Sequence, residues 1–197
     1  MNFYQQIRLT PDAVVGLGFL WTKVYTQVHL ALAEYNNSAN NIGISFPEYQ
    51  YNEKKPKDST IGKVIRVFAK DTDSLAKLDL RKWLKRLEDY ASLSEITECP
   101  TDSDYGVFTR YQPKNQSSLR RIARRRIERL QENEQQVMNH ISKLKTKKSN
   151  YPCILLVSLT NHHEYPLFIK LEKTSESESQ DYSTYGLSKN GSTVPIF

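Results

Sequence analysis

Six of the ten residues from Arg120 to Arg129 are arginines, in the order Arg-Arg-Ile-Ala-Arg-Arg-Arg-Ile-Glu-Arg. At about 100° per residue, an α-helix places four of them on one face in two i, i+4 pairs: Arg120, Arg121, Arg124 and Arg125. The guanidinium group is a planar fork of donors that binds phosphate oxygens and can read the O6/N7 edge of guanine. The spacing therefore predicts a rigid phosphate-binding face.

The opposite face of this helix is apolar. On the same helical wheel it consists of Leu119, Ala123, Ile127 and Leu130, which could dock the helix on a protein body. Arg126 and Arg129 fall at the flank of the arginine face. Glu128 follows the cluster and can pair with Arg124 or Arg125.

The alternative for such a run is a solvated basic face whose arginines pair with acids elsewhere. Residues 106–150 contain twelve Lys and Arg residues and three Glu residues, a net charge of +9. The whole chain carries +6, so the remaining residues carry −3. Because the positive charge is concentrated in one segment, we favour nucleic acid or another polyanion as the partner.

Histidine is the next residue type that could do chemistry. His29 lies beside the apolar stripe of a predicted helix, where a lone histidine is more often structural. His162 and His163 occupy a predicted turn, and adjacent histidines on an extended chain point apart. The sequence contains no HExxH, GxGxxG or P-loop motif, and neither Cys99 nor Cys153 has ligand spacing. We therefore expect no metal site and no cofactor.

RNA can be cut without a metal, because its own 2′-hydroxyl group attacks the adjacent phosphate once a base removes the proton. Histidine suits that task, since its ordinary pKa lies near working pH. The residue pattern alone leaves three functions open: a nuclease, a non-catalytic RNA-binding module, and a DNA-binding regulator that places the arginine helix in a major groove.

Hydrophobic periodicity indicates an α+β framework for these residues. We expect strands over residues 3–9, 42–46, 62–69 and 104–111, with one helix from about residue 12 and another over 72–90. The resulting βαββαβ order is the ferredoxin-like (RRM-like) arrangement, which many RNA-binding domains use. The predicted sheet lacks an aromatic RNP signature.

A second, smaller domain is expected to follow. We place the boundary near residue 97, giving a ferredoxin-like domain over 1–97 and a C-terminal domain over 98–197. The C-terminal domain would contain the arginine helix, over about residues 117–142, and short strands over 153–159 and 165–171.

The composition fits a globular protein, with 38% hydrophobic residues and 12 tyrosines. No apolar run approaches the roughly 20 residues that span a bilayer. The first residues enter a strand-like pattern and do not resemble a signal peptide. We therefore expect a cytoplasmic protein without a membrane partner.

Several sequence motifs occur together along the chain. The strongest is Tyr185-Gly-Leu-Ser-Lys189, which is followed by Gly191, Val194, Pro195 and Phe197. The others are the segment Ile42-Gly-Ile-Ser-Phe-Pro47, the strand from Tyr4 to Arg8, His29 in the first helix, and the arginine helix. With these motifs the chain resembles, from end to end, the CRISPR-associated endoribonucleases of type I-F (Csy-subtype) systems.

The resemblance implies a function and a set of catalytic residues. The family cuts precursor CRISPR RNA at repeat hairpins without a metal, leaving a 5′-hydroxyl and a 2′,3′-cyclic phosphate. It then stays on the mature guide RNA as a subunit of the surveillance complex. By position, His29 matches the general base, Ser158 the serine that holds the attacking 2′-hydroxyl, and Tyr185 a tyrosine that orients the site. The alternative is a non-catalytic subunit that binds the guide-RNA hairpin.

The resemblance also implies RNA contacts. Tyr165 matches an aromatic residue that stacks on the hairpin base near the cut. Arg110 and Gln112 match the linker pair that reads the lower stem, and we add the neighbouring Lys114 to the RNA-binding residues. The groove-binding residues are matched by Arg120, Arg121, Arg124 and Arg125.

Overall fold

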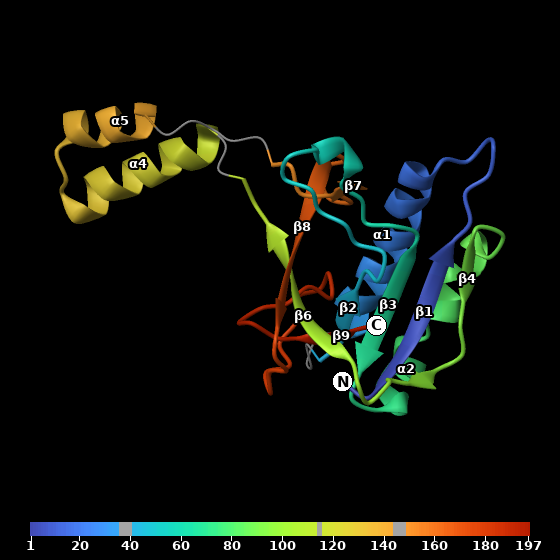
Figure 1. Ribbon diagram of the computed structural model, residues 1–197. Helices are drawn as coiled ribbons and strands as arrows, with labels where there is room; N and C mark the ends of the chain where they lie inside the picture. The colour runs from blue at the N-terminus through green and yellow to red at the C-terminus, as the bar shows by residue number, and fades with distance from the viewer. Residues whose placement is uncertain (36–40, 114–115, 144–148) are drawn as a thin grey trace. The chain divides into compact units, whose positions relative to one another are not determined.

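The computed structural model describes residues 1–35, 41–113, 116–143 and 149–197. The chain forms two compact units, shown in Figure 1: the first is Met1–Tyr111 with Tyr151–Phe197, and the second is Gln112–Asn150. The domain boundary expected near residue 97 falls inside the first unit, between its two sheets, and that division stays a prediction. Each unit is described below by itself.

The first sheet is antiparallel and carries the strands β2 (Gly43–Ser45), β3 (Val64–Ala69), β1 (Phe3–Leu9) and β4 (Ala91–Leu93), in that order. A short strand, β5 (Thr97–Glu98), also pairs with β1. β1 is central, because it pairs with both β3 and β4. The element order β1-α1-β2-β3-α2-β4 is the βαββαβ order expected from the sequence.

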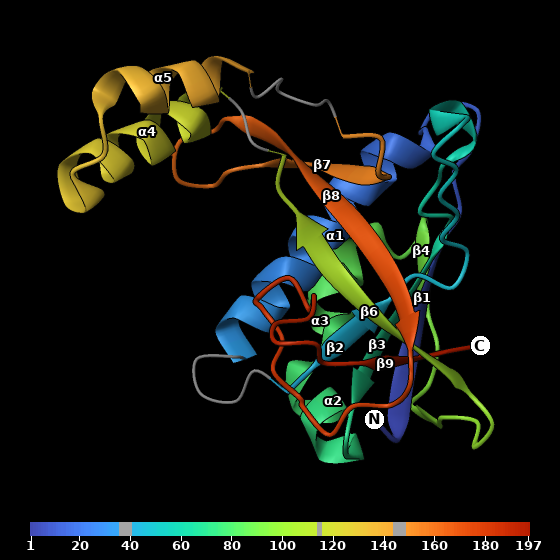
Figure 2. The ribbon, with the colours of Figure 1, turned by 60° about the vertical axis from the view of Figure 1, so that its left-hand side comes forward.

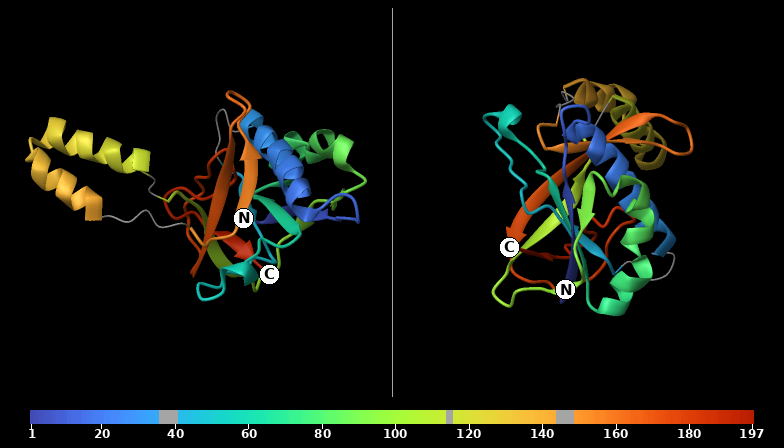
Figure 3. Two further views of the ribbon diagram at one scale, coloured as in Figure 1. Left: turned by 90° about the horizontal axis from the view of Figure 1, so that it is seen from above. Right: turned by 90° about the vertical axis from the view of Figure 1, so that its right-hand side faces the viewer.

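Helices α1 (Leu17–Tyr35) and α2 (Thr72–Leu78) contact β1 of this sheet, and the right panel of Figure 3 shows α1 and the α2 segment on the same side of it. The single helix expected over 72–90 is instead α2, α3 (Leu80–Leu84) and the 3-10 turn η2 (Lys85–Leu87). The break lies at Asp79, whose φ of 46° ends α2 while its carboxylate caps α3. Likewise, α1 begins at Leu17, later than expected.

The second sheet is also antiparallel. Its order is β7 (Cys153–Val157), β8 (Glu164–Thr174), β6 (Asp104–Tyr111) and β9 (Val194–Ile196). The expectation that residues 104–111 supply the fourth strand of the first sheet is therefore wrong. Alternating apolar residues identify a strand but not its partner, and β4 was too short to be recognised by its pattern. Figure 2 shows β6 and β8 running side by side.

The two sheets and α1 share one core. Helix α1 contacts β7 of the second sheet as well as β1 of the first, and β2 contacts β9. The Phe46 and Phe108 rings meet edge to face at 5.5 Å, which joins the end of β2 to β6. An aromatic pair of this kind stabilises the fold by about 0.5–1.5 kcal/mol beyond the stabilisation from burying its apolar surface. This packing fixes α1 between the sheets.

The second unit is a pair of helices, α4 (Gln116–Leu130) and α5 (Glu134–Lys143), which contact each other. The continuous helix expected over about 117–142 is therefore wrong. The chain turns at Gln131, whose φ is 51°, and the Asn133 carboxamide caps the start of α5 by accepting from the Gln136 N–H at 3.2 Å. Within the described parts of the chain, no helix of either unit is long and apolar enough to cross a membrane.

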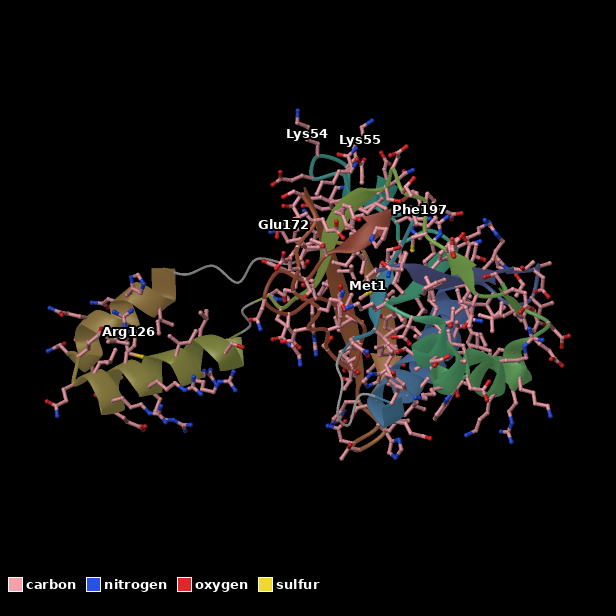
Figure 4. All side chains as sticks on the ribbon, turned by 90° about the horizontal axis from the view of Figure 1, so that it is seen from below. Met1, Lys54, Lys55, Arg126, Glu172 and Phe197 are labelled. Carbon is pink, nitrogen blue, oxygen red and sulfur yellow. The ribbon has the colours of Figure 1, made fainter. Side chains whose placement is uncertain are left out.

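Because the chain folds back after α4, helix α5 packs against α4 within the same unit. Leu119, Ala123 and Val137 are buried, whereas Leu130, which was expected on the docking face, is 66% exposed because it lies at the turn. Figure 4 labels Arg126 in this helix pair. The Arg126 guanidinium forms two bonds with the Glu132 carboxylate, at 2.6 and 3.0 Å, which tie α4 to the turn.

Candidate active site and nucleic-acid interface

A cavity of about 330 Å³ lies in the first unit where α1, the end of β7 and the loop after Tyr182 meet. Four of the predicted site residues line it: His29, Ser158 and Tyr185, expected to be catalytic, and Tyr165, expected to bind RNA. They come from four segments of the chain. The rest of the described lining is Thr26, Leu156, Val157, Leu159 and Thr160.

The His29 ring is held by the backbone. Its Nδ1 lies 2.8 Å from the carbonyl oxygen of Thr184. A carbonyl oxygen can only accept, so Nδ1 carries the proton and donates it. In the neutral ring, Nε2 then carries the lone pair and can accept a proton. The contact therefore selects the tautomer that a general base requires.

Tyr185 holds the same ring by stacking on its face. The His29 and Tyr185 rings stack with centroids 4.1 Å apart and an angle of 6° between their planes. The hydroxyl group of Tyr185 lies 2.9 Å from that of Tyr165. Burial, and next the bond with Tyr185, raise the pKa of Tyr165 to about 12. The Tyr165 hydroxyl therefore stays protonated near neutral pH and cannot serve as the base.

The loop that holds His29 is itself held at three successive carbonyl oxygens. His29 donates to that of Thr184, the Tyr25 hydroxyl donates to that of Tyr185 at 2.9 Å, and the Ile44 N–H donates to that of Gly186 at 2.9 Å. We call residues 184–186 the clamped loop. Tyr25 is fully buried one helical turn before His29, so one face of α1 supplies two of the three donors.

Gly186 allows this arrangement. Its φ is +67°, in the left-handed region that disfavours side chains, and an added Cβ would approach Ile44 to 2.5 Å. Two of the sequence motifs that carried the family resemblance, around Ile44 and around Gly186, are thus in direct contact. The close approach of the clamped loop to β2 explains why residue 186 is a glycine.

Ser158 directly follows β7 at a tight turn. Its N–H donates to the His163 carbonyl at 2.9 Å, and its own carbonyl accepts from the His162 N–H at 2.8 Å. These bonds close the turn between β7 and β8 and fix the Ser158 backbone at the cavity. His162 and His163 are exposed and do not line the cavity.

Arg110 lies near the same two tyrosines. Its guanidinium carbon is 5.4 Å from the centroid of the Tyr185 ring and 5.8 Å from that of Tyr165. A cation at this distance is attracted to the ring face. The sequence suggested a base-reading role for Arg110, and the structure adds a position next to the cavity at the end of β6.

The arginine face belongs to the second unit. The side chains of Arg120, Arg121, Arg124 and Arg125 are exposed on α4. Arg124 approaches Glu128 at 3.8 Å, the pairing expected from the sequence, and such an exposed pair is weak. Gln112 is exposed at the start of this unit, and Lys114 lies outside the described residues.

Sequence reasoning missed two groups that hold the clamped loop and the His29 ring in place, the Tyr25 hydroxyl and the Thr184 carbonyl. Tyr25 precedes His29 by four residues, so its helical spacing was a usable signal. The Thr184 carbonyl gave no signal, because a backbone carbonyl is the same for every residue type. Within the described ranges, no group of three or more His, Cys, Asp or Glu residues is arranged to hold a metal ion.

The chain is similar to one protein family in sequence and has a weak likeness to a solved structure. The profile of a family described as "CRISPR-associated protein (Cas_Csy4)" matches residues 4–197. A solved structure described as "An RAMP protein binding different RNA substrates" aligns with 100% of this chain and 100% of its own, at 10% sequence identity and a TM-score of 0.34.

Proposed function

We propose that this chain, which belongs to the Cas_Csy4 family of type I-F precursor CRISPR RNA endoribonucleases, cuts repeat stem-loops by metal-independent attack of a 2′-hydroxyl group. The observation that carries the proposal is the His29 ring. Its Nδ1–H is bonded to the Thr184 carbonyl, and Nε2 is left to accept a proton beside a cavity that Ser158 also lines.

The steps follow from these positions. His29 Nε2 takes the proton of the 2′-hydroxyl, which Ser158 holds, and the 2′-oxygen forms a bond to phosphorus. The bond from phosphorus to the 5′-oxygen breaks, and that oxygen takes a proton from solvent. The imidazolium returns its proton to solvent. The products are a 2′,3′-cyclic phosphate and a 5′-hydroxyl.

Tyr185 and Tyr165 act by position. Stacking of Tyr185 on the His29 ring fixes the plane in which Nε2 points, and holding a catalytic group in its reactive geometry lowers the barrier. The ring of Tyr165 offers a surface on which the base next to the cut can stack.

RNA recognition is divided between the two units. The arginine face would bind the phosphates of the hairpin, with Lys114 adding charge, while Arg110 and Gln112 read the lower stem. We further propose that the first sheet and its helices form a ferredoxin-like domain, which the βαββαβ order supports. After cleavage in the cytoplasm, the protein would keep the hairpin and join the other subunits of the guide-RNA surveillance complex.

The test is a repeat hairpin RNA with a single 2′-deoxy nucleotide before the cut. The all-ribose RNA should be cut in EDTA and yield a cyclic phosphate, and the deoxy RNA should bind equally well and remain intact. Cleavage of the deoxy RNA would exclude 2′-hydroxyl attack, and loss of activity in EDTA would indicate a metal. Binding without cleavage of the all-ribose RNA would favour the non-catalytic hairpin-binding alternative.

A further inference from the structure

Tyr165 has a hydroxyl group that the stacking role proposed for it does not use. Stacking on a base requires only the aromatic ring, and a phenylalanine would supply the same surface. The hydroxyl nevertheless has a specific partner, since its oxygen lies 2.9 Å from the hydroxyl oxygen of Tyr185. The tyrosine therefore adds a polar contact between two residues of the cavity that His29 lines.

The two tyrosines differ in how the chain holds them. Tyr165 is the second residue of β8, in register with Leu156 of β7, and the turn from Ser158 to His163 that joins the two strands is closed by backbone bonds. Tyr185 belongs to the clamped loop, whose three bonds act on backbone carbonyls. Those bonds do not by themselves fix the side-chain torsions of Tyr185. A residue on a paired strand can therefore support a ring that extends from a loop.

Stacking against His29 does not by itself fix the Tyr185 ring either. Two stacked rings can slide over each other, since several offset arrangements have similar energy. The Tyr185 hydroxyl lies at the end of the ring opposite the backbone, so a bond at that point removes this freedom. With the backbone held at one end and the hydroxyl at the other, the ring is kept within 6° of parallel to the imidazole.

The contact has the length of an ordinary hydrogen bond between hydroxyl groups. Either hydroxyl can donate, and the two rings are linked in both cases. Because burial and the bond raise the pKa of Tyr165 to about 12, its hydroxyl keeps the proton near neutral pH. The link between Tyr165 and Tyr185 therefore persists under the conditions in which a histidine base works.

We propose that the Tyr165 hydroxyl is a positioning group for RNA cleavage, which holds the Tyr185 ring parallel to the His29 imidazole and so keeps Nε2 in its reactive orientation. This inference rests on the proposed function. The hydroxyl acts through Tyr185 and not on the reacting atoms. Its loss should therefore slow the chemical step and leave RNA binding unchanged, whereas a purely structural bond would lower stability without changing the rate of the folded protein.

The experiment is a cycle of three variants of the full chain: Tyr165→Phe, Tyr185→Phe and the double variant, each of which keeps both aromatic rings. The single-turnover rate is measured with the all-ribose repeat hairpin RNA at saturating protein, the Kd with the 2′-deoxy RNA, and the melting temperature without RNA. The matched control is Tyr49→Phe, which removes a tyrosine hydroxyl that donates to the Ile169 carbonyl outside the cavity lining.

Tyr165→Phe and Tyr185→Phe should each lower the rate about fivefold, the effect of one hydrogen bond, at the parental Kd. The double variant should also lose about fivefold, and not the roughly 25-fold of two independent losses, because both changes break the same bond. Tyr49→Phe should cut RNA at the parental rate.

A second measurement follows the two rings by NMR in the absence of RNA. The ring current of Tyr185 shifts the imidazole protons of His29 upfield, because the two rings are stacked. In Tyr165→Phe this upfield shift should become smaller, since the Tyr185 ring has lost the bond that holds it. In Tyr49→Phe the shift should keep its parental value.

Three results would each overturn the inference and leave the proposed function standing: a parental rate in Tyr165→Phe, multiplied losses in the double variant, or an unchanged shift of the His29 protons. Weaker binding by Tyr165→Phe with a parental rate at saturation would make the hydroxyl an RNA contact instead. Failure of the parent protein to cut the hairpin RNA would count against the proposed function. The NMR measurement would then still decide whether Tyr165 holds the two rings.

Discussion

The first unit buries most of the large apolar side chains of the described chain, whereas the second buries Leu119, Ala123 and Val137. The first unit fixes the His29 ring by a bond, a stacked ring and a loop held at three carbonyls. The second presents exposed guanidinium groups on a pair of helices. Proton transfer needs atoms placed within tenths of an ångström, which requires a packed core. Phosphate binding by charge tolerates looser placement.

From this comparison we propose that the first unit cuts RNA and that the second supplies most of the binding energy. If that assignment holds, single changes should separate the two activities.

Removing the His29 ring should abolish cutting and leave binding intact. Because general base catalysis contributes about 10²- to 10⁴-fold, His29→Ala should lower the single-turnover rate by that factor at an unchanged Kd. The matched control is His163→Ala, in the exposed turn outside the cavity. Parental rates for His29→Ala across pH 6 to 9, with a loss in His163→Ala, would move the base to the other histidine.

Replacing Arg120, Arg121, Arg124 and Arg125 together by Ala should weaken RNA binding and leave cutting intact. Affinity should fall, and the slope of log K against log salt should flatten by about 0.7–0.9 for each lost phosphate contact. At saturating RNA the cleavage rate should stay near parental. The four-lysine variant keeps the charge and should retain the slope while binding less tightly, because it lacks the planar fork. An unchanged slope in the alanine variant would remove this face from the interface.

Arg110 belongs to the first unit, and Gln112 is the first residue of the second unit. If each reads a base, alanine variants should lose about 1–3 kcal/mol of discrimination against swapped lower-stem base pairs. Arg110 also lies over Tyr165 and Tyr185, so Arg110→Ala should in addition slow cleavage of the correct hairpin. Gln112→Ala should leave that rate unchanged. If both variants still reject swapped pairs as strongly as the parent, the linker does not read bases.

Tyr25→Phe should have the smallest effect. It removes one bond to the clamped loop, worth about 1 kcal/mol, so kcat should fall about fivefold with KM unchanged. The control is Tyr49→Phe, which removes a bond of the same kind, to the Ile169 carbonyl at 2.8 Å, outside the cavity lining. Both variants should lose similar stability, and only Tyr25→Phe should lose rate. Equal rates would make Tyr25 a purely structural residue.

The sequence predicted the first sheet well up to its last strand. The alternation in residues 3–9 and the apolar stripe of α1 each specify an element, because one face of it is buried, whereas residues 64–69 form a strand that is buried on both faces. The position of β6 was wrong, since its alternation fits either sheet equally. The helix breaks at Asp79 and Gln131 depend on left-handed φ values at non-glycine residues, which composition does not signal.

For the site, the sequence indicated the functional side chains but not the groups that hold them in place. His29, Ser158, Tyr165 and Tyr185 were named in advance, and the structure brings them to one cavity. Their catalytic roles stay predictions. What selects the tautomer of His29 is a backbone carbonyl far along the chain, and only the tertiary structure reveals such a contact.

His29 and Thr184 are 155 residues apart in the sequence. A ribosome that adds about 5–20 residues per second takes roughly 8 to 30 seconds to pass from the first to the second. Throughout that interval the nascent chain lacks the carbonyl that orients the histidine, although α4 is made well before it. Under the proposed mechanism, an unfinished chain that carries α4 would bind RNA before it could cut it.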